Sequence, residues 1–377
     1  KTNPPRVVRA PVGGVREEYR ETPRSVQLID PPFLGFFGKE VVVRGVPIRA
    51  HTCVSDGSLL VAADRLARML RNLPEPVMDR LTRRGASFHI IGVDQGTSDL
   101  PEHAHMKGVP GGYTKEGDIT LDQRARGMGG VNSSCGEENL IDLDSDPRYK
   151  GRDILSHEFA HCIMDYGLPP SLQRTIRETY DKSVHSEGRW KREDGTTAYA
   201  GSNASEFFAE LSMWYFGSRG EYVDRAARLP APGPGGLAAY DPDGFRLMAG
   251  IFSGVDPALH QTDVLQRVAP LKGAVPSLAR EEGLVELEFD NRECSTSWKL
   301  FWLNGGGERV PYGAIGKGAA HVQQTFSGHA WLLEAVGDQS NLARTVLVYM
   351  VGEGPCVASV ALDATGASDD AHMTPPL

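Results

Sequence analysis

The sequence predicts an α+β protein with a mainly helical first domain, which holds a small mixed sheet, followed by a small all-β sandwich. Two strongly helical segments lie near the middle of the chain, and a period-two alternation of apolar residues begins at Leu284. The length of 377 residues exceeds that of one ordinary hydrophobic core. These three observations together favour two domains of different class.

The composition excludes two broad classes of function. The chain has 40 basic and 49 acidic residues and a net charge of −9, which argues against a nucleic-acid partner. No uncharged apolar stretch reaches the roughly 18 residues that a membrane span needs. Glycine (43) and proline (25) are frequent, which predicts long loops and extended arms.

The five cysteines match no CxxC metal pattern and are too few and too odd in number for a disulfide scaffold. The chain starts at Lys1 instead of Met, which a removed secretory signal or a trimmed terminus would explain. We expect a secreted, extracellular protein. One bridge in each half with one thiol left over would then be natural, but the sequence does not decide the pairing.

In the first 282 residues, prolines keep residues 1–38 from regular helix and predict an extended N-terminal arm. Residues 39–257 form the first domain, and residues 258–282 read as a linker. Residues 95–136 are polar and Gly-rich and read as loop or a loose hairpin. The domain's expected strands are 40–44, 46–48, 87–93 and 139–143, and its expected helices are 58–70, 152–166, 203–216 and 245–252.

Residues 283–363 read as the sandwich, and the polar residues 364–377 as a flexible tail. Glycine, asparagine and proline turns separate its strands. The expected strands are 285–289, 298–303, 321–326, 330–335 and 345–351.

His157-Glu158-Phe159-Ala160-His161 is an HExxH motif on a predicted helix. Two histidines four residues apart lie on one helix face, about 40° and about 6 Å from each other, so both imidazoles can hold one Zn²⁺. Glu158 can then hold the attacking water. The alternative is a helix with two solvated histidines and a surface glutamate, and chance alone gives roughly 0.02 such matches per chain.

A catalytic zinc site needs a third protein ligand. Glu206 and Glu210 share one face of the second predicted helix, beside Phe207 and Phe208. A partly buried carboxylate needs a partner, and a metal ion can be one. The alternative is a pair of ordinary surface glutamates, which would be preferred if the HExxH motif were absent.

The HExxH motif, followed 45 residues later by Glu206 in Glu-Phe-Phe-Ala-Glu, resembles the metallopeptidase domain of anthrax lethal factor and its relatives. This gluzincin-like group includes small secreted bacterial proteases, and the resemblance covers roughly residues 85–255. It implies a zincin-type fold and one zinc ion held by His157, His161 and Glu206. It also implies that Tyr199, seven residues before Glu206, stabilises the oxyanion.

The mechanism that the resemblance implies is metal-assisted peptide hydrolysis. Zinc lowers the pKa of a bound water toward about 7. Glu158 would accept the proton and pass it to the leaving amine, and Tyr199 would donate to the developing oxyanion. Glu210 would orient a ligand histidine. His103 and His105 also alternate as metal ligands can, but no matching acidic cluster accompanies them, so a second metal site is disfavoured.

The segment from about residue 283 to 350 resembles the β domain of the von Hippel–Lindau protein, with a nearly gap-free match from Trp302 to Trp331. In that family the sandwich reads hydroxyproline in an extended peptide. The resemblance places Trp302, Tyr312 and Trp331 as pocket walls and His329 as the histidine that binds the hydroxyl. Thr325 stands where the family has serine, and Gln324 where it has histidine. The alternative is that the aromatic residues only fill the core.

Together the two resemblances imply a secreted zinc endopeptidase that cleaves proline- or hydroxyproline-rich proteins captured by its sandwich. A peptide-binding or adhesion protein with an idle HExxH domain is the alternative from another class. A further alternative is a sandwich that contacts the first domain and acts only as a structural brace.

Overall fold

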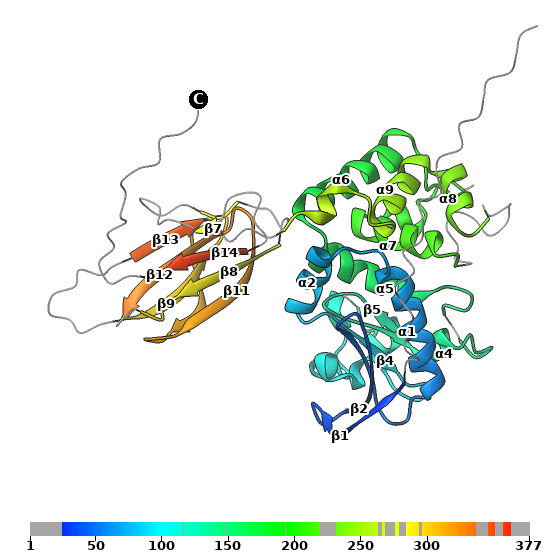
Figure 1. Cartoon of the computed structure of the whole chain (residues 1–377), viewed down its shortest axis with the longest axis horizontal. Helices are drawn as coiled ribbons and strands as arrows, with labels where there is room; N and C mark the ends of the chain where they lie inside the picture. The colour runs from blue at the N-terminus through cyan, green and yellow to red at the C-terminus, as the bar shows by residue number, and fades with distance from the viewer. Residues whose placement is uncertain are drawn as a thin grey trace, which may run out of the picture.

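The computed structural model confirms an α+β protein with a helical part and a separate β-sandwich (Figure 1). It describes residues 25–115, 117–146, 148–192, 194–218, 231–262, 266–267, 276–278, 284–293, 296–336, 346–350 and 357–362. Among these residues, no helix has the length and apolar character needed to cross a lipid bilayer.

The first sheet is mixed and has the strand order β1-β2-β3-β4-β6-β5. The strands β3, β4 and β6 run parallel to one another, whereas β2 is antiparallel to both its neighbours and β5 is antiparallel to β6. Strand β5 therefore forms one edge of the sheet. The bounds are β1 (Gln27–Phe33), β2 (Phe37–Val43), β3 (Val46–Ala50), β4 (Ser87–Ile91), β5 (Gly127–Met128) and β6 (Asn132–Gly136).

Helices α1 and α5 pack against this sheet, and α7 packs against α5 on the far side from it. The α-helices are α1 (Asp56–Leu70), α2 (Glu75–Arg83), α3 (Leu121–Arg124), α4 (Glu137–Leu140), α5 (Ile154–Cys162), α6 (Pro170–Tyr180), α7 (Ala204–Tyr215), α8 (Pro234–Tyr240) and α9 (Pro242–Phe252). Short 3₁₀ turns are η1 (Thr97–Asp99), η2 (Pro101–Met106), η3 (Gly112–Thr114), η6 (Tyr199–Gly201) and η7 (Pro257–His260). Two π-helical segments, η4 (Ile163–Gly167) and η5 (Asp181–Ser186), continue α5 and α6.

The N-terminal segment differs from the arm that we expected over residues 1–38. Its described part, from residue 25, forms strand β1 and the start of β2. Strand β1 contains Pro31 and Pro32, and proline is tolerated on an edge strand because no ladder hydrogen bond is needed on its outer side. The domain thus begins its sheet earlier than residue 39.

Residues 139–143, expected as a strand, instead contribute to the short helix α4. The first turn of this helix is fixed by Glu137, whose Oε1 accepts hydrogen bonds from the backbone N–H of Ser55 and the hydroxyl of Ser58, both at 2.9 Å. A tertiary contact therefore overrides the local strand propensity.

Residues 95–136, expected as loop or a loose hairpin, end in the antiparallel pair of β5 and β6, and β6 takes an interior position in the sheet. This strand is polar, Asn-Ser-Ser-Cys-Gly, yet most of it is buried. The hydroxyl of Ser133 donates to the backbone carbonyls of Gly130, at 2.8 Å, and Glu158, at 3.1 Å. Because the buried hydroxyl is satisfied by the neighbouring helix, the strand needs no apolar side chain there.

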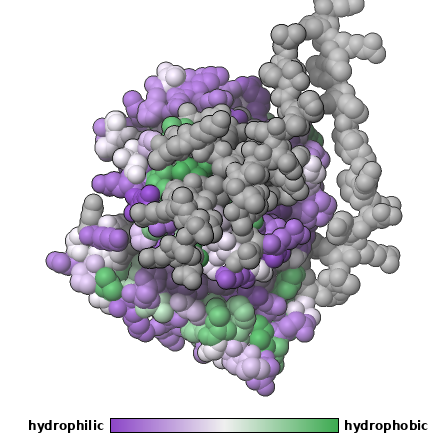
Figure 2. All heavy atoms as spheres, turned by 90° about the vertical axis from the view of Figure 1, so that its left-hand side faces the viewer, coloured by the Kyte–Doolittle hydropathy of each residue, from purple (hydrophilic) through white to green (hydrophobic). Residues whose placement is uncertain are grey.

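The sandwich consists of two four-stranded sheets, with the orders β10-β9-β12-β13 and β11-β8-β14-β7. Its strands are β7 (Gln266–Arg267), β8 (Leu284–Asp290), β9 (Ser297–Leu303), β10 (Arg309–Ile315), β11 (Ala320–Phe326), β12 (Ala330–Val336), β13 (Val346–Met350) and β14 (Val357–Ala361). Strand β7 comes from the expected linker, and β10 and β14 were not predicted. Outside the grey atoms, the side of the molecule seen in Figure 2 is mainly hydrophilic, with small separate hydrophobic patches.

Candidate metal centre

Helix α5 presents both histidines of the HExxH motif to α7. Asp153 caps its N-terminus by accepting hydrogen bonds from the backbone N–H and the hydroxyl of Ser156. Its apolar side chains are buried in the main core. The imidazole rings of His157 and His161 lie with their centroids 5.1 Å apart, as the four-residue spacing predicts.

Helix α7 brings Glu206 to the same place. Asn203 caps this helix by accepting a hydrogen bond from the backbone N–H of Glu206 at 2.9 Å. Oε2 of Glu206 lies 3.1 Å from Nε2 of His157 and 3.6 Å from Nε2 of His161. Two imidazole nitrogens and one carboxylate oxygen therefore point at one another from two neighbouring helices.

The two distances from Oε2 of Glu206 to the imidazole nitrogens suit ligands of a tetrahedral zinc ion. Ligand atoms about 2.0–2.2 Å from a tetrahedral zinc are separated from each other by about 3.4 Å, which lies between the two distances above. Oε2 of Glu206 is buried and makes no well-aligned hydrogen bond, although both imidazoles lie within ion-pair distance of it. A buried carboxylate oxygen needs a compensating partner, and a cation between it and the imidazoles would be one.

The other nitrogen of each imidazole is also contacted from α7. Nδ1 of His161 lies 2.7 Å from the hydroxyl of Ser205. Nδ1 of His157 lies 3.1 Å from Oε1 of Glu210, and Nη2 of Arg152 lies 2.5 Å from the same oxygen. Contacts of this kind fix the ring orientation of a metal-binding histidine.

Without a metal ion, the charged groups of the site shift one another's pKa values. Burial alone would raise the pKa of Glu206, but the imidazoles of His157 and His161 hold it well below its usual range. Burial alone would lower the pKa of His157, but its contacts with the carboxylates of Glu206 and Glu210 raise it to about 10. A proton on His157 therefore occupies part of the space that a cation would fill.

Glu158 lies in the same cluster, with a carboxylate oxygen within 4.8 Å of ligand atoms of both histidines. Burial raises its pKa, although the two imidazoles oppose this. A carboxylate with a raised pKa beside a candidate metal site is suited to taking up and releasing a proton.

Tyr199 lies in the turn η6, just before α7. Its ring stacks on His157 with centroids 6.0 Å apart, and 47% of the residue is exposed. Burial and the nearby Glu206 raise the pKa of its phenol, so the hydroxyl stays protonated and can donate a hydrogen bond. It is thus an exposed donor at the edge of the site.

The edge of the sheet passes directly over α5. A Cβ atom on Gly127 would lie 2.8 Å from Oε1 of Glu158, and one on Gly129 would lie 2.9 Å from Cδ2 of His161. A larger residue at either position would force the backbone there or a side chain of α5 to shift. The backbone of β5 and the residues after it therefore form one wall of the site.

In the sandwich, the five residues of the predicted pocket also meet. Trp302 and Trp331 pair across β9 and β12, and the rings of Trp302 and His329 lie 5.2 Å apart. Tyr312, 47% exposed, packs edge-on against Trp331 at 4.9 Å. The indole N–H of Trp331 donates to the hydroxyl of Thr325 at 2.9 Å.

Burial divides these five residues. Trp331 and Thr325 are almost fully buried and belong to the interior of the sandwich, whereas Tyr312 is exposed. Trp302 and His329 are half-buried, and the indole nitrogen of Trp302 has no hydrogen-bond partner. A ligand would therefore meet Tyr312, Trp302 and His329, with Trp331 behind them.

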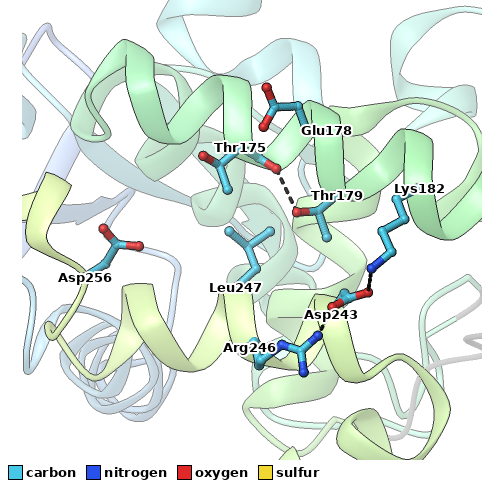
Figure 3. Close-up of a pocket in the computed structure, with 8 residues that line it drawn as sticks. All are labelled: Thr175, Glu178, Thr179, Lys182, Asp243, Arg246, Leu247 and Asp256. Carbon is cyan, nitrogen blue, oxygen red and sulfur yellow. Dashed lines mark hydrogen bonds and ion pairs between the residues drawn. The ribbon is translucent and has the colours of Figure 1, made fainter.

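Two other features lie apart from this chemistry. His103 and His105 are on η2, and among the described residues they join no group of three potential metal ligands. A pocket of about 370 Å³ lies between α6, η5 and α9, and its walls carry Glu178, Lys182 and Asp243 (Figure 3). None of its lining residues is a candidate site residue.

Sequence reasoning missed four residues of the metal centre: Arg152, Ser205, Gly127 and Gly129. Ser205 directly precedes Glu206, so its position on the same helix was a usable signal. Arg152 lies one turn before the motif, but its contact with Glu210 depends on how α5 and α7 pack. The glycines lie in the Gly-rich stretch that was expected as loop or a loose hairpin, but their contact with α5 depends on how that segment packs against the helix.

No protein-family model and no curated protein matches this sequence. Among solved structures, one similar chain is a Pro-Pro endopeptidase from Paenibacillus alvei. It shares 16% identity, and the match covers 50% of this chain and 88% of that chain with a TM-score of 0.21. At these values the similarity carries no conclusion about this protein.

Proposed function

We propose that this chain is a zinc-dependent endopeptidase. The observation that supports this most is the meeting of His157 Nε2, His161 Nε2 and the buried Glu206 Oε2, with Glu158 in the same cluster. Three protein ligands beside a carboxylate base are typical of a catalytic zinc site, whereas structural zinc sites have four protein ligands. The resemblance of the motif and its spacing to the lethal-factor group supports the same reaction class.

Zinc bound here would polarise the scissile carbonyl and activate a water molecule. The carboxylate of Glu158 accepts the proton of the attacking water and returns it to the leaving amine. The hydroxyl of Tyr199, exposed and protonated, donates a hydrogen bond to the oxygen that develops negative charge. Glu210 and Ser205 keep the two imidazoles oriented throughout.

Replacing Glu158 tests this mechanism directly. Glu158→Gln keeps the size of the side chain and all three ligands, so we expect one zinc per chain and a loss of turnover of about 10²–10⁴-fold. Zinc content is measured by atomic emission and turnover with a mixed peptide library read by mass spectrometry. Full activity of the variant would refute the mechanism, and no cleavage by the zinc-loaded wild-type chain would favour the peptide-binding alternative.

We further propose that the sandwich captures proline- or hydroxyproline-containing segments and that the protein acts outside the cell. The support is the cluster of Tyr312, Trp302 and His329, since a proline ring packs well on aromatic faces. An extended proline-rich segment also loses little conformational entropy on binding. Because the hydroxyl of Thr325 is buried against Trp331, His329 is the better-placed partner for a ligand hydroxyl.

Paired peptides that differ only in proline versus hydroxyproline test the capture. We expect Tyr312→Ala to raise KM for such peptides while kcat changes little, because the side chain is exposed and far from the reacting atoms in sequence and domain. Val322→Ala, also exposed on the sandwich, is the control. Equal KM values for Tyr312→Ala and the wild-type chain would leave the sandwich as a structural brace.

A further inference from the structure

The C-terminal end of the metal-site helix is held by Arg80 of α2 and by Arg84, which directly follows α2. Helix α5 continues as η4, and the last carbonyl groups of such a helix lack intrahelical partners. Nη1 of Arg84 donates to the carbonyl of Tyr166 at 2.9 Å, and Nη1 of Arg80 donates to the carbonyl of Gly167 at 3.2 Å. A cation at a helix C-terminus also interacts favourably with the helix dipole.

The sandwich reaches the same arginines through Glu286 on β8. Oε1 of Glu286 accepts from Nε of Arg84 at 3.2 Å, and Oε2 accepts from Nε of Arg83 at 2.9 Å. The side chain of Arg84 is 1% exposed and that of Glu286 is 12% exposed. Figure 1 shows α2 on the side of the first domain that faces the sandwich. Desolvation offsets much of the attraction in a buried ion pair, but removing one partner of such a pair is costly because the other charge stays buried.

This contact leaves little freedom around the end of the metal-site helix. A Cβ atom on Gly167 would lie 3.1 Å from the side chain of Leu81 and 3.2 Å from that of Val77, so α2 packs closely on η4. Arg80 also donates to the carbonyl of Gln261, in the segment that leads to the sandwich. His161, in the last turn of α5, is five residues before Tyr166.

We propose that Glu286 is a positioning residue for the metal site. By fixing Arg84 against the Tyr166 carbonyl, it fixes the end of the helix that carries His161. The sandwich then contributes to the zinc affinity of the first domain, and its removal or displacement weakens zinc binding. This inference rests on the proposed metal site, but it does not depend on what the sandwich binds.

Two matched variants of the full chain test the proposal. Glu286→Gln removes the charge that pairs with Nε of Arg84, and we expect the dissociation constant of zinc to rise about five- to tenfold, less than when a direct partner of a ligand is lost. Glu288→Gln is the control, because it changes the same residue type two positions along β8. The carboxylate of Glu288 pairs with Arg292 of the same domain, so zinc binding should stay unchanged. Zinc affinity is measured by chelator competition, and the visible spectrum of the cobalt-substituted chain reports the ligand geometry.

A second set of variants separates positioning from general loss of stability. Arg83→Gln removes only the half-exposed side of the contact, so the chain should fold and show a smaller shift in the same direction. The double variant Arg84→Gln with Glu286→Gln should be no worse than Arg84→Gln alone, because both act through one contact. Unchanged zinc affinity in Glu286→Gln, or an equal change in Glu288→Gln, would overturn the proposal.

Zinc affinity is measured without turnover, so this test stands apart from the proposed reaction. A wild-type chain that binds zinc and cleaves no peptide would refute the endopeptidase function alone. A shift in zinc affinity confined to Glu286, Arg84 and Arg83 would still support the positioning role.

Discussion

The two candidate zinc-binding imidazoles are supported from behind by different chemical groups. Nδ1 of His157 faces the carboxylate of Glu210, which Arg152 also contacts, whereas Nδ1 of His161 faces the neutral hydroxyl of Ser205. A carboxylate makes an imidazole more basic than a hydroxyl does. His157 should therefore bind zinc more strongly than His161.

Replacing these supports should therefore weaken zinc binding unequally. We expect Glu210→Gln to raise the zinc dissociation constant by about 10–100-fold and Ser205→Ala to raise it less. Glu178→Gln, on the exposed face of α6, serves as the control. Chelator competition at constant pH measures all three, and equal effects of Glu210→Gln and Ser205→Ala would contradict the asymmetry.

The same contacts make zinc binding depend on pH. In the metal-free chain the pKa of His157 is raised to about 10 by Glu206 and Glu210, so this imidazole is protonated at neutral pH and zinc must displace the proton. Affinity should rise by up to about tenfold per pH unit between about pH 7 and 10, and level off above the pKa. Calorimetry in buffers of different ionisation enthalpy measures the released proton; no release near pH 8 would be inconsistent with this.

At this scale the sequence predicted the residues whose positions follow from helix geometry. His157 and His161 are four residues apart, so they lie on one face of their helix, next to Glu158. Glu206 and Glu210 are also four residues apart and lie on one face of the second helix. Ser205 and Arg152 act across the packing of two helices, which residue spacing alone does not describe. Thr325 shows the same limit, because its burial against Trp331 depends on how two strands of the sandwich face each other.

Among the elements, the edge strand β5 and Gly129, which directly follows it, constrain the site most closely. Gly129→Ala would place a methyl group 2.9 Å from Cδ2 of His161, so either the strand or the imidazole must move. We expect weaker zinc binding and lower turnover with little loss of secondary structure. Gly250→Ala on α9, where a Cβ atom would find ordinary contact distances, is the control.

Zinc binding in the Gly129→Ala chain is measured by chelator competition and turnover with the peptide library. The Gly250→Ala chain should retain both, because alanine is favoured over glycine inside a helix. Normal zinc affinity in Gly129→Ala would show that the backbone at residue 129 can move away from α5 without weakening zinc binding.

Helices with strong periodicity and clear caps were predicted well, and elements fixed by tertiary contacts were not. Helices α5 and α7 have side-chain caps at Asp153 and Asn203 and end close to the expected residues. Helix α6 was not predicted, and it begins at Pro170, in the first helical turn, where proline is favoured. Strand β6 is polar although most of it is buried, so it carried no alternation of apolar residues that the sequence could reveal. The buried hydroxyl of Ser133 is satisfied by two backbone carbonyls instead.

At the scale of the whole molecule, the chain has separate hydrophobic cores. The main core joins α1, α5, α7 and the first sheet, whereas the sandwich has its own clusters around Trp298 and Trp331 and around Leu303 and Leu332. The buried contact of Glu286 with Arg84 joins the two parts by charge. The class of each domain could be predicted because the apolar residues of each recur with a different period in the sequence. The contact between Arg84 and Glu286 could not, because no sequence pattern links these two residues.

Separate cores predict two unfolding transitions, and zinc should move only one of them. The zinc ligands lie on α5 and α7, so free zinc at 100 times its dissociation constant stabilises the first domain by about 2.7 kcal/mol. For a domain of this size that raises its Tm by roughly 5–11 °C. The sandwich has no ligand in the site, so its transition should shift much less, by no more than its contact through Glu286 transmits. Differential scanning calorimetry of the full chain with zinc and with chelator measures both transitions. A single transition that moves as a whole would mean that the ion pair between the two parts couples their unfolding, despite their separate cores.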